Sequence, residues 1–589
     1  MRDLLVKFLI WRIKHFSDRN FIILLGSIVG AVAGMASVIL KQTVHFIHIL
    51  LIGGSDIRYE NYLYLSYPLI GLVLTVILTK YFLKEKLGHG ISGILYDISR
   101  RFAKMKASKT FSRIITSAIT VGFGGSVGLE APIVVTGSAI GSNIGQLMHL
   151  DYKKKTILIG CGAAGAIAGI FNSPVAGVLF AIEVLLTNIT VAIFIPLLIA
   201  AVSGSLISLL FLGKDVLFSF KLTDPLTATD IPFYILLGLV TGLFAVYFTR
   251  ITYKTENIIN RIKNVFPKAL IGGLLLGLII FIFPPIYGEG YATIKSLLEA
   301  ESGVVLANSL FFSQIENPLF IILFLTGVLL IKPIASAITI GAGGSGGIFA
   351  PSLFVGGILG FIFAVVANSF LGADLSVKNF VLVGMCGSMS GILHAPLTAI
   401  FLIAEITSGY TLFIPLMLVS AISYNAIIYF EKYSLYTKHL IEKGDLIQHD
   451  KDKEVLSQIN IKKIVETDLL TISPDATLGD LVNLVRKSKR NIFPVVNDAN
   501  ELLGVITLDD IREVMFDREA QENVFIRSLM SSPPSSVTSH ENMQSVMSKF
   551  EITGAWNLPV IDDGKYVGFL SKSRIFNSYR KKLIRAHKE

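Results

Sequence analysis

The sequence places a carboxylate, Glu130, within a strongly apolar stretch of the chain. Glu130 lies in the segment "GGSVGLEAPIVVTG" (124–137). A glycine-rich break followed by proline and an apolar run predicts a helix that begins inside the membrane rather than at its surface. The first amides of such a helix lack intrahelical acceptors and carry the positive end of the helix dipole. They therefore form a site for an anion without a full positive charge.

The Glu130 carboxylate can take the place of the anion at this helix start. Deprotonated, it would plug the site, and protonation or displacement of the side chain would open it. Carboxylates inside membrane segments are energetically costly and indicate a functional role by default. The structural alternative is a glutamate that only caps the first turn of the helix.

The motif around Glu130 belongs to an internal repeat. The segment "GGSVGLEAP" (124–132) matches "GGSGGIFAP" (343–351), and "FNSPVAGVLFAIEV" (171–184) matches "LHAPLTAIFLIAEI" (393–406). Both pairs keep the same order and a separation of about 220 residues, which indicates two duplicated halves. Transporters built from such halves bind their substrate where the interrupted helices of the two repeats meet. We therefore expect two helix starts to aim their amides at one central point.

The elements that must position this site are membrane helices. Of the 589 residues, 52% are hydrophobic and only 16% are charged. Charge-free apolar stretches at 21–40, 194–212 and 269–288 are each long enough to cross the hydrocarbon core of a bilayer. The fold class is therefore a polytopic all-α membrane protein. The two cysteines, Cys161 and Cys386, offer neither a disulfide framework nor the spacing of metal ligands, so we expect no metal site.

Basic residues indicate the orientation of the chain. The N-terminal "MRDLLVKFLIWRIKHF" alternates bases with apolar residues, which predicts an interfacial helix rather than a signal peptide. Short basic loops at 100–113 and 151–155 are placed in the cytoplasm by the positive-inside rule. The net charge of +10 is explained by these loops and needs no nucleic-acid partner. We expect a multi-pass protein of the cell membrane with a cytoplasmic N-terminus.

The composition of the chain changes near residue 440, where a charged, mixed segment begins. We divide the chain into a membrane domain over 1–440, a linker over 441–460, and two soluble domains over 461–518 and 524–582. The soluble part also repeats, since "NIFPVVNDANELLGVITLDDI" (491–511) resembles "WNLPVIDDGKYVGFLSKSRI" (556–575). Each unit predicts an apolar strand, a turn, a second strand and the start of a helix.

Together these motifs resemble a known family. "GSVGLEAP", "GGIFAP" and the duplicated proline–glutamate blocks are similar to those of the CLC family of chloride channels and proton-coupled chloride transporters. The soluble repeats resemble a pair of CBS domains, which implies an α/β pair on the cytoplasmic side. The resemblance implies a CLC-type inverted repeat with broken, re-entrant helices. It also implies a homodimer with a separate chloride pathway in each protomer, although the site's physics specifies only a small anion.

The resemblance assigns roles to individual residues. Glu130 matches the external gating glutamate of the family. The amides of Ile348 and Phe349 match donors to the central anion, and Tyr436 falls where the family places a tyrosine hydroxyl on that anion. In "GHGISG" (88–93), Gly90 keeps a helix-start amide, whereas His89 replaces the usual serine. The His89 imidazole either donates a hydrogen bond to the anion or points at a backbone carbonyl.

The mode of transport depends on Val184. Proton-coupled members of the family usually carry at this position a glutamate that receives protons from the cytoplasm, and valine cannot titrate. We therefore expect passive, glutamate-gated chloride permeation. Chloride/proton exchange is the alternative, because some members that lack this glutamate still exchange protons. An anion sensor with a vestigial pore is a further alternative, whereas nothing in the chain assembles the nucleophile, metal site or P-loop of an enzyme.

The soluble repeats differ in their nucleotide signature. CBS domains often bind adenine nucleotides through Ser/Thr, two further residues and an Asp that contacts the ribose. The first repeat has Thr507 and Asp510, whereas the second keeps Ser571 but has Arg574 in place of Asp. We expect at most one site for ATP or AMP and no required cofactor. A pair that only mediates dimer contacts is the alternative.

Overall fold

The computed structural model describes residues 12, 15–52, 57–84, 90–186, 191–213, 227–299, 318–407, 409–442 and 459–588. The chain forms two compact units, Met1–Leu446 and Ile447–Glu589. Most of the interfacial helix expected at the N-terminus lies outside the described residues.

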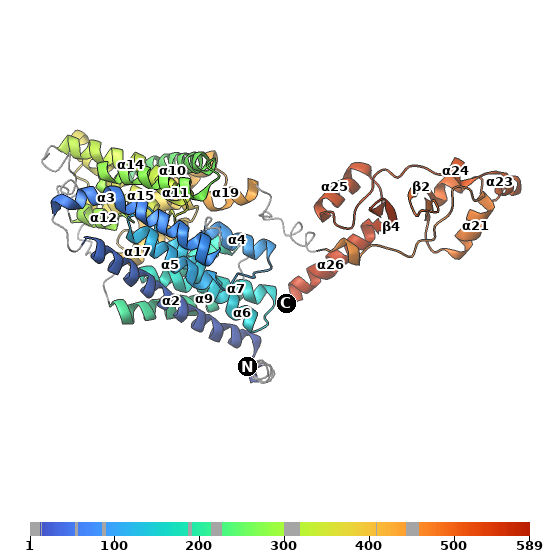
Figure 1. The fold of residues 1–589 in the computed structure, drawn as a ribbon, viewed down its shortest axis with the longest axis horizontal. Coiled ribbons are helices and arrows are strands. Elements are labelled where there is room, and N and C mark those ends of the chain that lie inside the picture. The colour runs from blue at the N-terminus through green and yellow to red at the C-terminus, as the bar shows by residue number, and fades with distance from the viewer. Residues whose placement is uncertain are drawn as a thin grey trace. The chain divides into compact units, whose positions relative to one another are not determined.

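The first unit is a bundle of apolar helices (Figure 1). Among the described residues, nine helices are long and apolar enough to cross a membrane, which confirms the predicted multi-pass helical fold. The elements are α2 (Asp18–Ile52), α3 (Ile57–Ile77), η1 (Leu78–Leu83), α4 (Gly90–Arg100), α5 (Lys109–Gly122), α6 (Glu130–Leu147), α7 (Tyr152–Phe171), α8 (Pro174–Phe180), η2 (Ala181–Leu185), α9 (Val191–Leu212), η3 (Ala228–Asp230), α10 (Ile231–Asn260), α11 (Val265–Ile282), η4 (Pro284–Ile286), α12 (Tyr291–Leu298), α14 (Pro318–Gly341), α15 (Phe349–Leu371), α16 (Val377–Leu393), α17 (Pro396–Ile406), α18 (Phe413–Phe430) and α19 (Leu435–Glu442).

The duplicated motifs begin equivalent helices in the two halves. Helix α6 begins at Glu130 and α15 begins at Phe349, so both start within the glycine-rich repeat. Helices α8 and α17 begin at Pro174 and Pro396, the matched prolines of the second repeat. Proline is favoured in the first turn, where its missing N–H would have no intrahelical partner. The predicted duplication and the broken helices are therefore confirmed.

The two halves meet through backbone hydrogen bonds at the start of α6 and α15. The N–H of Gly128 donates to the carbonyl oxygen of Gly347 over 2.8 Å, and the N–H of Gly347 donates back to Gly128 over 2.9 Å. This antiparallel bridge joins the residues just before each helix. It holds both N-termini together in the interior of the bundle, as expected for interrupted helices of an inverted repeat.

Each short helix is capped by a glutamate from the other half. Glu405 accepts hydrogen bonds from the N–H groups of Val175 and Ala176 in α8, at 3.0 and 2.9 Å. Glu183 accepts from the N–H groups of Leu397 and Thr398 in α17, at 2.9 and 2.8 Å. Carboxylates stabilise helix N-termini by pairing the orphan amides and complementing the dipole. These two glutamates therefore hold the halves together.

The second unit contains two β-hairpins with helices around them (Figure 1). Both hairpins are antiparallel, and the unit has the predicted α/β character of a CBS pair. The repeats meet where the N–H of Tyr566 donates to the carbonyl oxygen of Asn500 over 2.8 Å. The elements are η5 (Ile461–Lys463), α21 (Leu478–Lys487), β1 (Ile492–Val496), β2 (Leu502–Thr507), α22 (Leu508–Ile511), α23 (Arg518–Asn523), α24 (Ile526–Leu529), α25 (Met543–Thr553), β3 (Asn557–Asp562), β4 (Lys565–Ser571) and α26 (Lys572–Lys588).

Candidate functional site

The Glu130 side chain is buried between the two helix starts. The residue is 1% exposed, and its Oε1 accepts a hydrogen bond from the Tyr291 hydroxyl over 2.7 Å. The backbone N–H of Ala350, in the first turn of α15, faces the carboxylate. Its Oε2 is buried and has no hydrogen-bond partner among the described residues. The carboxylate of one half therefore lies at the helix start of the other half.

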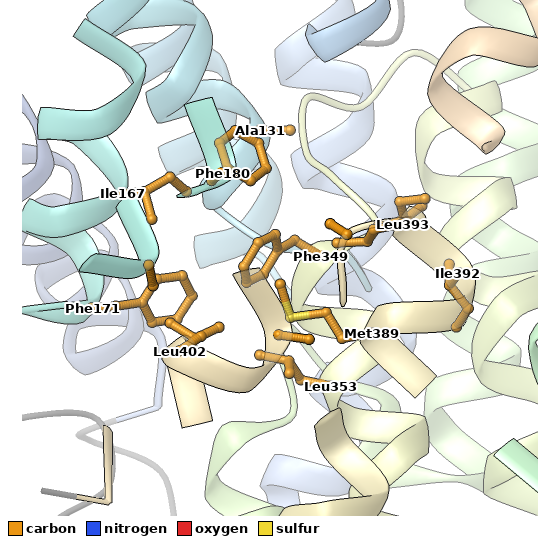
Figure 2. Close-up of a cluster of buried hydrophobic side chains, with 14 of the residues drawn as sticks. Ala131, Ile167, Phe171, Phe180, Phe349, Leu353, Met389, Ile392, Leu393 and Leu402 are labelled. Carbon is orange, nitrogen blue, oxygen red and sulfur yellow. The ribbon is translucent and has the colours of Figure 1, made fainter. Parts of the chain in front are cut away.

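Ile348 and Phe349 lie at the start of α15, with their side chains in the hydrophobic core. Both are buried, and the Phe349 ring stacks on Phe171 with ring centroids 5.3 Å apart. Figure 2 shows the Phe349 ring inside an apolar cluster that also includes Phe180. The N–H of Ser352 is the donor that bonds back to the carbonyl of Ile348, over 2.9 Å. The earlier amides of α15 thus lack intrahelical acceptors, as an anion site requires.

Tyr436 brings a buried hydroxyl toward the same region. The residue is 4% exposed, and its hydroxyl has no partner among the residues that the structure describes. The charge of Glu130 acts on this hydroxyl, so the two groups lie within electrostatic range. Ser92 Oγ in α4 donates to the Tyr436 carbonyl over 2.6 Å, which ties α19 to α4. Helix α4 begins at Gly90 and packs against α6.

The structure describes only one of two further residues predicted for this site. His89 lies outside the described residues. Val184 is partly buried in the π-helical turn η2 and packs against the main hydrophobic core. The adjacent Glu183 also accepts from Thr398 Oγ1 over 2.6 Å, in addition to its two backbone donors. Its carboxylate is therefore committed to capping α17.

Sequence reasoning missed a loop that contacts Glu130 and the residue before it. The loop 284–291 contributes Tyr291, which donates to Glu130, and Glu289, whose Oε1 accepts from the N–H of Leu129 over 3.2 Å. Lys332 in α14 is fully buried and donates to carbonyl oxygens of this loop, at Ile286 (3.1 Å) and Gly288 (3.0 Å). A signal was present: "YGEGY" (287–291) places a carboxylate between glycines within an apolar context, as around Glu130.

In the soluble unit, Thr507 and Asp510 bind each other. Asp510 Oδ2 accepts from the N–H and the hydroxyl of Thr507, both at 2.7 Å, and the N–H of Asp510 donates to Thr507 Oγ1 over 3.4 Å. This is a capping box at the start of α22. The signature for a ribose contact therefore also has a local structural role, and Asp510 remains exposed.

The second repeat presents basic rather than acidic chemistry at the matching position. Arg574 is exposed, and its N–H donates to Ser571 Oγ over 3.2 Å. Hydrogen bonds from Arg490 lower the pKa of Asp468, and the charge of Arg574 contributes to the same effect. Across the described residues, no group of three or more His, Cys, Asp or Glu side chains could hold a metal ion.

The sequence and the fold were compared with those of known proteins. A family model described as "Voltage gated chloride channel" matches residues 70–427, and the CBS domain model matches 461–517 and 526–581. Chloride channel protein CLC-f of Arabidopsis thaliana is 24% identical over 564 residues, which cover 84% of this chain and 69% of the relative. The H⁺/Cl⁻ exchange transporter ClcA of Vibrio vulnificus is 27% identical over 427 residues, which cover 69% of this chain and 86% of the relative. A solved slow cyanobacterial Cl⁻/H⁺ antiporter shares the fold, with a TM-score of 0.61, 22% identity, and coverage of 74% of this chain and 99% of that chain.

Proposed function

Because the chain belongs to the voltage-gated chloride channel family, the CLC family, we propose that it moves chloride across a membrane in exchange for protons, with Glu130 as the gate. The observation that carries the proposal is the Glu130 carboxylate itself. It is buried at the helix start of α15, and one of its oxygens has no partner among the described residues. A carboxylate in this place competes with an anion for the same amides.

The proposed cycle follows from that competition. Ionised Glu130 occupies the amides at the start of α15 and excludes the anion. When the carboxyl group takes up a proton, it loses its charge and yields the site to chloride, which the amides of Ile348 and Phe349 and the Tyr436 hydroxyl then bind. Amide and hydroxyl donors hold the anion without a full opposite charge, so it can leave again. Each passage of chloride is thereby linked to the protonation state of one residue.

Exchange takes precedence over the passive permeation expected from the sequence. The relative ClcA is named an exchange transporter, and the structural neighbour is an antiporter. Passive conduction is the second candidate, and the observation that favours it is Val184, which cannot titrate. The remaining alternative, an anion sensor with a vestigial pore, has no single observation in its favour.

Flux measurements on reconstituted vesicles test these candidates together. We expect chloride leaving the vesicles down its gradient to drive protons inward against theirs. Replacement Glu130→Gln removes the proton-binding carboxyl group and should abolish the proton movement while chloride still passes. Chloride flux without uphill proton movement in the wild type would establish the passive candidate, and the absence of chloride flux would favour the sensor.

Several finer features of the function are also proposals. We place the N-terminus and the CBS pair in the cytoplasm of a cell-membrane protein, because the basic loops at 100–113 and 151–155 favour that side. We expect a homodimer, as in the family. An adenine nucleotide at Thr507 and Asp510 would regulate transport from the soluble unit.

A further inference from the structure

We infer that Glu289 is a second proton-binding carboxylate of the transport pathway, which passes protons to Glu130 and receives them from it. The inference rests on the proposed exchange function and deepens it, because it names the group from which the gate draws its proton.

The geometry comes from one loop that touches the gate region twice. Tyr291 donates to Glu130 Oε1 over 2.7 Å, and Glu289, two residues earlier, accepts from the N–H of Leu129 over 3.2 Å. Leu129 directly precedes Glu130 at the start of α6. The charge of Glu130 acts on Glu289, and the hydrogen bonds of this loop place both carboxylates at the start of α6. Glu130 Oε2 is buried without a partner among the described residues, which leaves an acceptor for a proton.

The charges around Glu289 come from four elements. Glu130 lies at the start of α6, Lys41 in α2, Tyr291 in α12 and Lys332 in α14, and each interacts electrostatically with Glu289. With both carboxylates ionised and both lysines protonated, the two glutamates and two lysines have a formal charge of zero. An incoming chloride adds one negative charge to this buried group, and one bound proton cancels it. Because an uncompensated buried charge is unfavourable, anion and proton binding should favour each other here.

The difference in solvent exposure between the two carboxylates indicates which of them exchanges protons with water. Glu130 is 1% exposed, whereas Glu289 is only partly buried, so Glu289 is the more accessible of the two carboxylates. In the proposed step the carboxyl O–H bond of Glu289 breaks and an O–H bond forms on Glu130, so the pair keeps one proton and one negative charge throughout. Glu289 then takes up the next proton from water.

A purely structural role predicts a different outcome, and the two are separable by substitution. As a cap for the Leu129 N–H, Glu289 needs only an acceptor oxygen at the end of a side chain of this length. Glu289→Gln keeps that oxygen and cannot carry a proton. Glu289→Asp keeps a titratable carboxyl group and shortens the side chain. A proton carrier therefore ranks Asp above Gln, whereas a cap ranks Gln above Asp.

The experiment measures proton uptake and chloride efflux together from vesicles containing the full-length protein. We expect Glu289→Gln to lower the ratio of proton to chloride flux by about tenfold or more, since a positioned proton-transfer group commonly contributes more than this. Glu289→Asp should retain a higher ratio. The matched control is Glu299→Gln, an exposed glutamate just after α12, which should keep the wild-type ratio. The ratio does not depend on how much of each variant has folded.

A wild-type ratio in Glu289→Gln, or a higher ratio in Glu289→Gln than in Glu289→Asp, would overturn the inference and leave Glu289 as a cap. Failure of the exchange proposal looks different, because the wild-type protein itself would then move no protons uphill. In that case the pH dependence of chloride flux shows whether Glu289 is a proton-binding site. A shift of that dependence in Glu289→Gln supports the proton site, and an unchanged dependence rejects it.

Discussion

The two oxygens of the Glu130 carboxylate have different surroundings, and this difference bears on the proposed gating. Oε1 is held by the Tyr291 hydroxyl, whereas Oε2 is buried without a partner among the described residues. A hydrogen bond to a charged acceptor contributes about 1.5–3 kcal/mol. Tyr291 therefore stabilises the ionised side chain in the position from which we propose that it excludes the anion.

Replacement Tyr291→Phe should weaken the closed state of the gate. Because a factor of ten corresponds to about 1.4 kcal/mol, loss of this hydrogen bond is expected to raise chloride flux by about tenfold or more at alkaline pH, where the carboxylate is ionised. Chloride efflux from vesicles at several pH values measures the effect. The control is Tyr287→Phe in the same loop, because the Tyr287 hydroxyl donates to the carbonyl of Gly122 over 3.2 Å and not to the gate. Equal flux in Tyr291→Phe and the wild type would contradict this role.

At the scale of the element, the loop 284–291 depends on one backbone position. Gly290 has a φ of +87°, and a Cβ at this position would overlap the ring of Phe354 in α15. Positive φ is unfavourable for residues with a side chain, by about 1–3 kcal/mol. Glycine thus lets the loop lie against α15 and bring Tyr291 to Glu130.

Gly290→Ala is expected to displace the loop and lower the stability of the membrane unit. The backbone contribution is about 1–3 kcal/mol, and the clash with Phe354 adds to it. Thermal unfolding in detergent measures the loss, and vesicle flux should show weaker pH dependence because Tyr291 moves away from Glu130. Gly372→Ala is the matched control, since Gly372 has a φ of +61° but nothing within 4 Å of an added Cβ. Equal unfolding temperatures for the two variants would exclude the clash.

At the scale of the whole molecule, the soluble unit carries a proposed nucleotide site in addition to the proposed anion site of the membrane unit. The two CBS repeats differ at the ribose position, and the Asp of the first repeat already serves a capping box. The proposed nucleotide contact and the observed helix cap therefore involve the same carboxylate. Any test of Asp510 must separate these two roles.

The first CBS repeat supplies its own control. Helix α21 has the same capping box, formed by Thr477 and Asp480. Loss of a cap costs about 1 kcal/mol, so Asp510→Ala and Asp480→Ala should destabilise the unit similarly. Only Asp510→Ala should weaken binding of ATP and AMP, measured by calorimetry on the full-length protein. Equal nucleotide binding by the wild type and Asp510→Ala would refute the assignment, and no binding by either would favour a scaffold.

The sequence by itself determined the helices and their duplication. Glycine-rich breaks act through the conformational freedom of the glycine backbone, and prolines at helix starts act through their missing N–H donor. Long apolar runs span the membrane because their length matches the thickness of the hydrocarbon core. None of these effects depends on residues that are distant in the sequence. The repeated motifs therefore predicted where α6, α15, α8 and α17 begin. They also predicted a carboxylate at one of these starts.

Only the tertiary structure decided which side chains meet at those starts. Tyr291 lies 161 residues from Glu130 along the chain, and Glu289 lies 160 residues from Leu129. Such contacts depend on how whole helices pack, and neither periodicity nor composition encodes them. A charged residue in an apolar segment can be recognised from the sequence as costly. The partners that stabilise it are brought to it by the fold.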